Sequence, residues 1–490
     1  MKALRISLNF YIICQLLGTV FMFLGLFLIS AVAVGIFYGE GKSIAAYTFS
    51  VILIEIIAIS LYFFGKDREK GPLMRKEAIA TVAISWIGMG ILGAIPYILD
   101  GGIQNPIDAF FESVSGFTTT GSSILTDIES LSHASLFWRS LTQWLGGMGI
   151  IVLFVAIFPQ LGVGAKQLFK SEVPGPITEG IKPRIKETSS LLWKIYLGLT
   201  VLLTLILYFG GMTFFDAICH SFTTMATGGF STKNASIKFY DSAFIDYAIT
   251  LFMLLASLNF TLYYMVLKGN TIKVTKDAEL RVYLAIISIT LIVVVINTLS
   301  HFDEDFFNSF RYSLFQIVSL ITTTGFATYD YELFPVISKI MLVSVMFVGG
   351  CAGSTAGGIK VSRILMATKA SVFDIYKNYQ PQHIKSIKIN NYPLSQELIK
   401  GVLTFIYIYF LIVLFGTIFM STQGLDFETS FTSVLTCLSN VGPGLGSIGP
   451  TENFYHISGI GKLFLSFCMI MGRLELYTFL VLFIPAFWRR

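Results

Sequence analysis

Long apolar runs recur along this chain and restrict the folds that it can adopt. A helix of about 20 apolar residues spans roughly 30 Å of hydrocarbon, so each such run is a candidate membrane span. Of the 490 residues, 54% are hydrophobic and only 13% are charged, which is too little charge for a soluble protein of this length. The sequence therefore predicts an all-α polytopic membrane protein with ten spans. The runs lie at about 6–37, 44–64, 78–99, 136–158, 191–210, 243–267, 282–300, 334–375 (interrupted), 401–420 and 460–487.

The first run admits two interpretations, a retained helix or a cleaved signal peptide. It follows Lys2 and Arg5 and contains the small-residue sequence AVA at 31–33. Its apolar stretch is about twice the usual length of a signal-peptide core, so we expect a retained first span.

Cysteine and histidine usage argues against a disulfide framework and a metalloenzyme. The five cysteines lie far apart without a CxxC pair, and the five histidines are scattered without an HExxH motif. We expect no metal cluster held by these residues and no bound organic cofactor.

Basic residues alternate between the connections and predict the topology. The loops at 66–76, 166–186, 268–281 and 360–400 carry 21 Lys and Arg residues in all. The connections at 38–43, 100–135, 211–242, 301–339 and 421–458 carry 5. Because basic loops stay in the cytoplasm, the first set and both termini are predicted to be cytoplasmic.

Four shorter, semi-apolar segments lie between the spans, at about 106–120, 213–227, 305–324 and 425–440. If each crossed the membrane, the basic loops 66–76 and 166–186 would face opposite sides. We therefore expect the segments to enter from outside and return. Such irregular backbone is tolerated only where it is buried in protein or lines a water-filled cavity.

Each short segment ends in a turn with glycine, and the pattern predicts an internal repeat. One such turn alone is most simply an external loop, but four at matching positions point to convergence around an axis along the membrane normal. The turns are TTTG (118–121), MATG (225–228), TTTG (322–325) and SNVG (439–442), with glycines at Gly121, Gly228, Gly325 and Gly442. The predicted units are two N-terminal helices (1–76) and pore repeats at 77–187, 188–278, 279–390 and 391–490, the third with a broken second helix.

The turns suit a dehydrated monovalent cation, which rings of backbone carbonyls can bind. Glycine permits the backbone angles that aim carbonyls inward and leaves no side chain in the way. The hydroxyls either add ligands or, as we favour, stiffen the extended backbone; they belong to Thr119, Thr120, Thr227, Thr323 and Thr324. Val441 shows that a hydroxyl is not needed in every repeat.

The short helices themselves favour a cation at the centre, because their partially negative C-termini would point there. Asp108, Asp216 and Asp426 fall near the opposite ends. We expect these aspartates to be helix N-caps.

The eighth run is interrupted by GGCAGSTAGGIK at 349–360. A nucleotide P-loop is excluded because the GK[ST] ending is absent. Gly349 and Gly353 also form a GxxxG pattern, which permits close helix packing. We favour an unwound stretch that lines the cavity beneath the turns and acts as a gate, since irregular backbone at this depth needs polar surroundings.

Arg473 lies near the middle of the tenth run. Ionisable residues within spans usually face the bundle interior and mark ion paths. We expect Arg473 to project into the pore just inside the turns and to repel or pace cations; a structural salt bridge between helices is the alternative. Glu475 is a possible partner, although residues two apart on a helix do not face each other.

These motifs in combination resemble the Trk/Ktr/HKT superfamily of potassium transporters, and most closely its bacterial Trk-type uptake subunit. The resemblance covers essentially the whole chain, and the two spans before residue 77 look like the extra N-terminal pair of the Trk branch. The segments that carry it are DAFFESVSGFTTTG (108–121), WRSLTQWLGGMGI (138–150), ATGGFST (226–232), FQIVSLITTTGF (315–326), GSTAGGIK (353–360), SNVGPGLG (439–446) and GRLE (472–475).

The resemblance implies a fourfold pseudosymmetric potassium pore, a homodimer in the bacterial inner membrane, and a cytosolic ring of nucleotide-binding regulatory subunits. It makes Arg473 the pore arginine. It implies a selectivity filter of Thr119, Thr120, Gly121, Ala226, Thr227, Gly228, Thr323, Thr324, Gly325, Asn440, Val441 and Gly442. It implies a gating loop that contains Gly349, Gly350, Gly353, Ser354, Thr355, Gly357 and Gly358.

Two filter positions bear on ion preference. Serine at the first filter position accompanies sodium preference in plant relatives, so Gly121 favours potassium. The fourth turn, SNVGPG, departs from the pattern because it lacks the threonine, which implies asymmetric coordination there.

Two other function classes compete with a pore. An alternating-access transporter, for an organic solute or a coupled cation, commonly uses inverted repeats, whereas the four units here run parallel. A membrane enzyme needs a nucleophile, a metal cluster or paired carboxylates, and none occurs at interpretable spacing. The sequence therefore favours potassium uptake without enzymatic activity.

Overall fold

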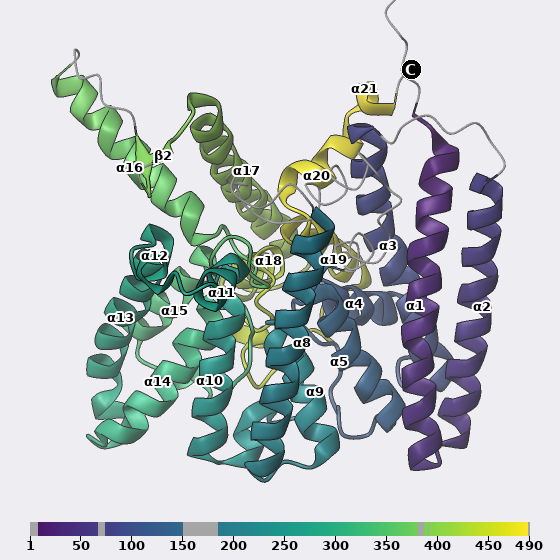
Figure 1. The fold of residues 1–490 in the computed structure, drawn as a ribbon. Coiled ribbons are helices and arrows are strands. Elements are labelled where there is room, and N and C mark those ends of the chain that lie inside the picture. The colour runs from purple at the N-terminus through teal and green to yellow at the C-terminus, as the bar shows by residue number, and fades with distance from the viewer. Residues whose placement is uncertain (1–7, 67–73, 150–184, 381–386, 391, 489–490) are drawn as a thin grey trace, which may run out of the picture.

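The computed structural model describes residues 8–66, 74–149, 185–380, 387–390 and 392–488, and these are mostly helical (Figure 1). The α-helices are α1 (Phe10–Tyr38), α2 (Gly41–Lys66), α3 (Arg75–Asp100), α4 (Pro106–Phe117), α5 (His133–Met148), α8 (Ile185–Phe209), α9 (Phe214–Met225), α10 (Ala243–Ser257), α11 (Phe260–Leu267), α12 (Thr271–Thr275), α13 (Ala278–Thr298), α14 (Phe306–Ile321), α15 (Val336–Val348), α16 (Val361–Tyr379), α17 (Gln396–Ser421), α18 (Phe427–Ser439), α19 (Gly459–Arg473), α20 (Leu476–Leu480) and α21 (Pro485–Trp488). The 3₁₀ helices are η2 (Ser236–Tyr240), η3 (Leu299–Phe302), η4 (Tyr331–Leu333), η5 (Gly446–Ile448) and η6 (Val481–Phe483).

One short antiparallel pair of strands, β1 (Lys388–Ile389) and β2 (Tyr392–Pro393), lies in the connection between α16 and α17. Several segments with predicted cytoplasmic placement lie outside the described residues. They are most of the 66–76 loop, nearly all of 166–186 and both extreme termini; the second half of the fourth apolar run is outside them too.

The long helices confirm a multi-pass membrane protein. Within the described part of the chain, 6 helices are long and apolar enough to cross a bilayer, or 7 if one bent pair counts as a span. They begin at Phe10, Gly41, Lys76, Ser190, Ala278 and Gln396, and the bent pair begins at Ala243. The N-terminal helices α1 and α2 stand side by side at one edge of the molecule (Figure 1), where they pack on each other and on α3 and α5.

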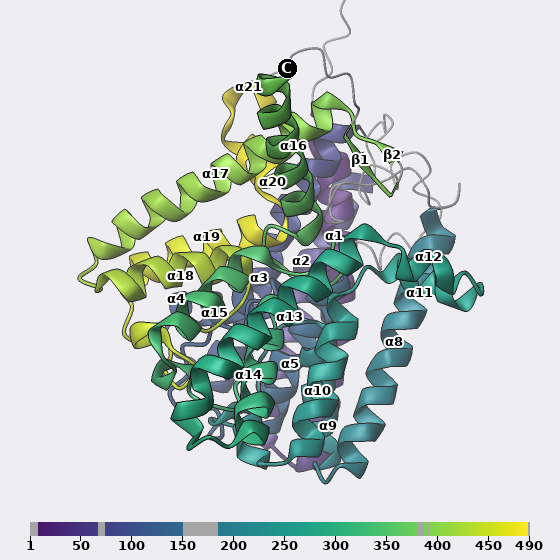
Figure 2. The same cartoon turned by 90° about the vertical axis from the view of Figure 1, so that its left-hand side faces the viewer.

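The four semi-apolar segments form the short helices α4, α9, α14 and α18, of 12, 12, 16 and 13 residues. At 1.5 Å per residue, none is long enough to cross the bilayer. Each packs against the long helix before it and against the second helix of the preceding unit: α4 on α3 and α19, α9 on α8 and α5, α14 on α13 and α10, and α18 on α17 and α15. Figure 2 shows α17, α18 and α19 together on one side.

The expected aspartate caps are right at one position and wrong at two. Asp426 caps α18 by accepting a hydrogen bond from the Thr429 amide at 3.3 Å. The Thr429 side chain also hydrogen-bonds this carboxyl and lowers its pKa, so the cap stays charged. Asn105 caps α4 and Thr213 caps α9 instead.

The two displaced aspartates lie in the first turns of their helices, where a carboxylate still complements the helix dipole. Asp108 pairs with Lys462 at 2.7 Å. Asp216 accepts hydrogen bonds from the hydroxyls of Thr213 and Thr232, at 2.9 and 2.6 Å.

Two runs that the sequence predicts as continuous spans are broken. The run 243–267 bends by 93° between α10 and α11. The tenth run breaks after α19, where Glu475 takes a φ of 60°. Arg473 is therefore the last residue of α19 and does not lie within a continuous span. The predicted break of the eighth run is confirmed, since residues 349–360 separate α15 from α16.

Candidate functional site

The four short helices end in turns whose first residue has a left-handed backbone. The φ angles are 55° at Thr119, 54° at Thr227, 57° at Thr323 and 57° at Asn440. This region is unfavourable for β-branched residues, so three strained threonines mark the same point in three turns. Asparagine adopts this region readily, which explains why the fourth turn reads SNVG.

The hydrogen bonds of the turns repeat in the same register. The next residue in each turn donates its amide to the carbonyl five residues earlier: Thr120 to Ser115, Gly228 to Thr223, Thr324 to Ser319 and Val441 to Thr436, at 2.8–2.9 Å. The equivalent segments are therefore 119–121, 227–229, 323–325 and 440–442, which we call turns 1 to 4.

This register corrects one expectation. The third residue of turn 2 is Gly229, not Gly228, and it shares a positive φ with the other three glycines. Their φ angles are 84° at Gly121, 77° at Gly229, 83° at Gly325 and 103° at Gly442. The sequence ATGG permits either alignment, and the end of α9 at Met225 decides between them because it fixes where the left-handed residue falls.

The third-position glycines pack each turn against the next. A Cβ atom added to Gly121 would overlap the carbonyl oxygen of Gly228 in turn 2. One on Gly229 would overlap that of Thr324, and one on Gly325 that of Val441. One on Gly442 would lie 2.8 Å from that of Thr120, which closes the circuit at turn 1. The glycines are thus required by contact between turns.

The threonine hydroxyls of turns 1 and 3 bond within their own turns. Thr118 and Thr120 share a hydrogen bond of 2.7 Å, and Thr322 and Thr324 share one of 2.8 Å. The amide of Asn440 links turn 4 to turn 1 by donating to the Thr120 hydroxyl at 3.0 Å. These contacts fit the stiffening role expected for the hydroxyls.

The segments that leave the turns are also joined in sequence around the circuit. Ile128 donates its amide to Asn234 at 2.6 Å, and Lys238 donates its amide to Ala327 at 3.1 Å. The Tyr331 hydroxyl donates to the Gly444 carbonyl at 2.9 Å. The Phe454 amide donates to the Ser123 carbonyl at 2.9 Å and so joins the segment after turn 4 to the segment after turn 1.

The 349–360 loop lies against three of the turns. The Gly357 amide donates to the Thr323 hydroxyl at 2.6 Å, and the Gly358 amide donates to the Ser439 carbonyl at 2.9 Å. The Thr355 hydroxyl lies 3.4 Å from that of Thr227. This loop is non-helical, so the alternative of GxxxG packing between helices is wrong. Its expected members are Gly349, Gly350, Gly353, Ser354, Thr355, Gly357 and Gly358, all partly or fully buried.

The same loop occupies the break between α10 and α11. The amides of Cys351 and Thr355 donate to the Ser257 and Ala256 carbonyls, at 3.0 and 3.3 Å. The Gly353 carbonyl accepts from the Phe260 amide at 3.1 Å. Carbonyls at the end of a helix need such partners, so the loop explains why the predicted span stops at Ser257.

A carboxylate that the sequence analysis missed holds the base of the loop. Glu279, at the start of α13, accepts the Ala352 amide at 2.7 Å and the Ser362 amide at 3.1 Å. One side chain thereby joins the two ends of the loop. Its position within the first turn of an apolar helix was the available signal, because charged groups near spans usually have specific partners.

Arg473 is 9% exposed and binds three carbonyl groups. It donates to Thr355 of the loop at 2.6 Å, and to Gly146 and Gly147 at the end of α5 at 2.6 and 2.5 Å. It therefore ties α19 to the loop and to α5. The Glu475 carboxylate pairs with Arg363 of α16 at 2.6 Å.

The part of the chain that the structure describes holds no cluster of three or more His, Cys, Asp or Glu residues suited to a metal ion. The site instead offers backbone carbonyl and hydroxyl oxygens in four equivalent turns. Such groups can replace the hydration shell of a monovalent cation.

Known proteins are similar to this chain in sequence and fold along almost its whole length. A family model for TrkH, described as a cation transport protein, matches residues 44–490. The Trk system potassium uptake proteins TrkH of Salmonella typhimurium and Escherichia coli K12 are each 40% identical over 491 residues, covering 98% of this chain and 100% of the relative. The crystal structure of the potassium transporter TrkH from Vibrio parahaemolyticus superimposes with a TM-score of 0.88 at 33% identity, covering 98% of this chain and 100% of that one. The chain belongs to the TrkH family of cation transport proteins.

Proposed function

We propose that this protein takes up potassium across the bacterial inner membrane and that the ions pass through the four turns. The observation that carries the proposal is the closed circuit in which each third-position glycine packs on the carbonyl of the next turn. Four such turns bring several carbonyl oxygens to one place, as binding of a dehydrated potassium ion requires. The TrkH relatives of Salmonella and Escherichia coli carry potassium uptake in their names.

The proposed filter comprises residues 119–121, 226–229, 323–325 and 440–442, so Gly229 joins the residues expected from the sequence. The proposed repeats remain 77–187, 188–278, 279–390 and 391–490, after two N-terminal helices at 1–76. The C-termini of α4, α9, α14 and α18 end at the turns, and their partial negative charge favours a cation there. Inward flow gains about 2.3 kcal/mol per 100 mV of membrane potential.

The 349–360 loop is the proposed gate. It is held against the turns by its own amides, at its base by Glu279, and at Thr355 by Arg473. A homodimer with a cytosolic ring of nucleotide-binding subunits beneath it would act on this loop from the side of the basic connections. Both termini would then be cytoplasmic.

A cation-coupled, alternating-access transporter is the second candidate. The broken helices α10–α11 and α15–α16 favour it, since such transporters use discontinuous helices at their binding sites. The closed circuit of four turns favours the pore, because it leaves no second half that rocks against a first.

Growth of a potassium-uptake-deficient bacterium at low potassium tests the proposal. The unmodified chain, expressed with its cognate regulatory subunit, should restore growth. Gly121→Ser should restore less growth at low potassium and admit more sodium, because the added side chain disturbs the contact with Gly228. Failure of the unmodified chain to rescue would reject potassium uptake.

Transport of a solute larger than a bare alkali ion would reject the pore in favour of alternating access. Uptake measured with organic cations in the same cells supplies that comparison.

A further inference from the structure

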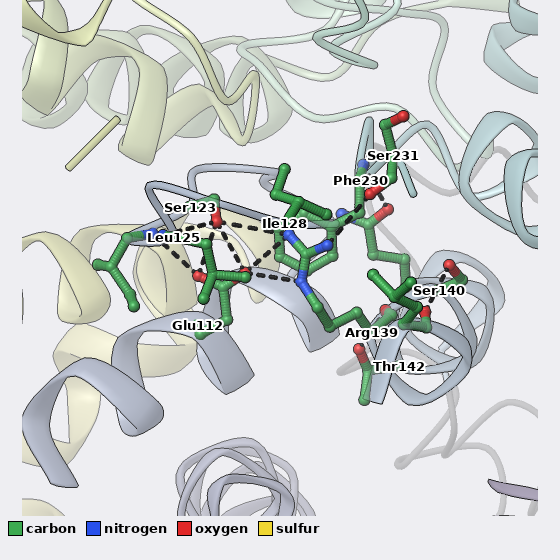
Figure 3. Close-up of polar contacts among 12 residues, drawn as sticks. Glu112, Ser123, Leu125, Ile128, Arg139, Ser140, Thr142, Phe230 and Ser231 are labelled. Carbon is green, nitrogen blue, oxygen red and sulfur yellow. Dashed lines mark hydrogen bonds and ion pairs between the residues drawn. The ribbon is translucent and has the colours of Figure 1, made fainter. Parts of the chain in front are cut away.

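A buried ion pair lies beside the segments that follow the first two turns (Figure 3). Arg139 of α5 and Glu112 of α4 approach to 2.9 Å, and their side chains are only 1% and 0% exposed. A buried pair gains little net stability, because removing both charges from water costs about as much as their attraction returns. Stability alone therefore does not account for this pair.

Glu112 holds the segment that leaves turn 1. Its carboxylate accepts the Ser123 hydroxyl at 3.0 and 3.1 Å and the Ile124 amide at 3.0 Å. Ser123 follows Gly121 by two residues, so the Glu112 carboxylate limits how far turn 1 can move.

Arg139 holds the segment that leaves turn 2. It donates to the Ser231 carbonyl at 3.2 Å, and its guanidinium lies 4.1 Å from the centre of the Phe230 ring. Phe230 directly follows Gly229. The Glu112–Arg139 pair therefore joins the segments that follow turns 1 and 2 (Figure 3).

The equivalent positions in the other repeats carry no carboxylate. Seven residues before each left-handed residue lie Glu112, His220, Gln316 and Ser433. His220 contacts the Ser231 hydroxyl at 2.9 Å, and Gln316 donates to the Tyr329 carbonyl at 3.1 Å. Side chains without a carboxylate thus support the exits of turns 2 and 3, so the fold does not need a carboxylate at this position.

We propose that Glu112 and Arg139 are positioning residues that set the spacing of turns 1 and 2, and thereby the preference of the pore for potassium over sodium. The inference rests on the proposed function. Selectivity between these ions depends on how the filter arranges its coordinating carbonyls, and a charge-assisted pair is stronger than the contacts that His220 and Gln316 make at the equivalent positions.

The chain contains a matched control. Asp108 and Lys462 also join α4 to a second helix, at 2.7 Å with 11% and 5% exposure. This pair lies at the opposite end of α4 from turn 1, and Lys462 additionally donates to the Tyr455 carbonyl at 2.9 Å. Both pairs join α4 to another helix and can stabilise the fold in that way. We expect only Glu112 and Arg139 to affect selectivity as well.

The test measures potassium and sodium fluxes of the full-length chain in lipid vesicles, with size-exclusion chromatography to confirm folding. The double variant Glu112→Gln/Arg139→Gln removes both charges and avoids a lone buried ion. Ser123→Ala keeps the pair and the Ile124 amide contact but removes the hydroxyl contacts that Glu112 and Arg139 make with the segment after turn 1. We expect the potassium-to-sodium flux ratio to fall about fivefold in both, an effect of roughly 1 kcal/mol.

The control variant Asp108→Asn/Lys462→Gln should keep the wild-type ratio even if its thermal stability falls. An unchanged ratio in Ser123→Ala and in the folded double variant overturns the inference. If the double variant does not fold, Ser123→Ala decides alone. A wild-type chain that carries no potassium would instead refute the proposed function, so the two failures are distinguishable.

Discussion

At the scale of single residues, three threonines occupy a left-handed backbone conformation that costs of order 1–3 kcal/mol each. Their hydroxyls give a reason to keep them at two positions. The Thr323 hydroxyl accepts the Gly357 amide at 2.6 Å, and the Thr227 hydroxyl lies 3.4 Å from that of Thr355. The strained positions therefore connect the turns with the 349–360 loop, and the strain accompanies a contact between the proposed filter and the proposed gate.

The two adjacent glycines of turn 2 should respond differently to alanine. Gly229→Ala places a Cβ against the Thr324 carbonyl at a φ of 77°. Gly228 has no positive φ, and a Cβ there meets the end of the Gln143 side chain, whose hydrogen bonds to the Gly228 carbonyl and the Phe230 amide would have to rearrange. We expect Gly229→Ala to reduce potassium uptake by about tenfold or more and Gly228→Ala to reduce it several times less. Uptake rates in the potassium-uptake-deficient strain check this, and equal or reversed effects would contradict the assigned register.

At the scale of elements, the 349–360 loop and the ends of neighbouring helices satisfy each other's backbone hydrogen bonds. The loop supplies amides to the carbonyls that end α10 and α18, and Arg473 binds the carbonyls that end α5. Unpaired carbonyls at these ends would be costly at membrane depth. Movement of the proposed gate would therefore require new partners for several carbonyls.

Two substitutions of Arg473 distinguish the effect of its charge from the effect of its hydrogen bonds. Arg473→Ala should raise potassium flux by about fivefold, because the loop loses a hydrogen bond at Thr355 and the path loses a positive charge. Arg473→Lys keeps the charge but lacks the planar fork that reaches both α5 and the loop. We expect its flux in vesicles to lie closer to that of Arg473→Ala.

Arg281→Ala removes an exposed arginine at the start of α13 and serves as the control, with unchanged flux. Wild-type flux in Arg473→Ala would show that this residue neither tethers the gate nor paces cations.

At the scale of the whole molecule, the proposed site exists only because four units close on one another. Each second helix packs on the short helix of the next unit, and α19 returns to α4. The Asp108–Lys462 pair joins the first and last of these helices across 354 residues of sequence. A cation bound between the turns would contact all four units and stabilise the entire assembly.

Potassium should therefore raise the melting temperature of the purified protein at constant ionic strength. A ligand at 100 times its Kd stabilises the folded state by about 2.7 kcal/mol. Thermal unfolding with potassium, sodium or choline chloride measures the effect, and we expect potassium to exceed sodium and choline to have none. The difference in melting temperature between potassium and sodium should be smaller in Gly121→Ser. Identical melting temperatures in all three salts would argue against a filter site.

Local patterns predicted much of this architecture. The length of the apolar runs indicated the multi-pass class, although only 6 or 7 of the ten predicted runs form helices long enough to span a bilayer within the described residues. The semi-apolar segments predicted the four short helices that the structure contains. The glycines of GGCAGSTAGGIK predicted the break after Val348. In contrast, the break after Ser257 has no glycine or proline signal, because it depends on amides contributed by a loop about 100 residues away.

The sequence by itself determined the class of protein, the number of short helices and the residues at or next to each turn, because hydrophobic length, charge and backbone freedom are local properties. Only the tertiary structure decided that Gly229 belongs to turn 2, that Glu279 and Arg473 hold the loop, and that Arg139 pairs with Glu112. The assignment of Gly229 depends on where α9 ends and on its packing against the Thr324 carbonyl. The other contacts depend on which carbonyls, amides and carboxylates lie within hydrogen-bonding distance after the helices pack together.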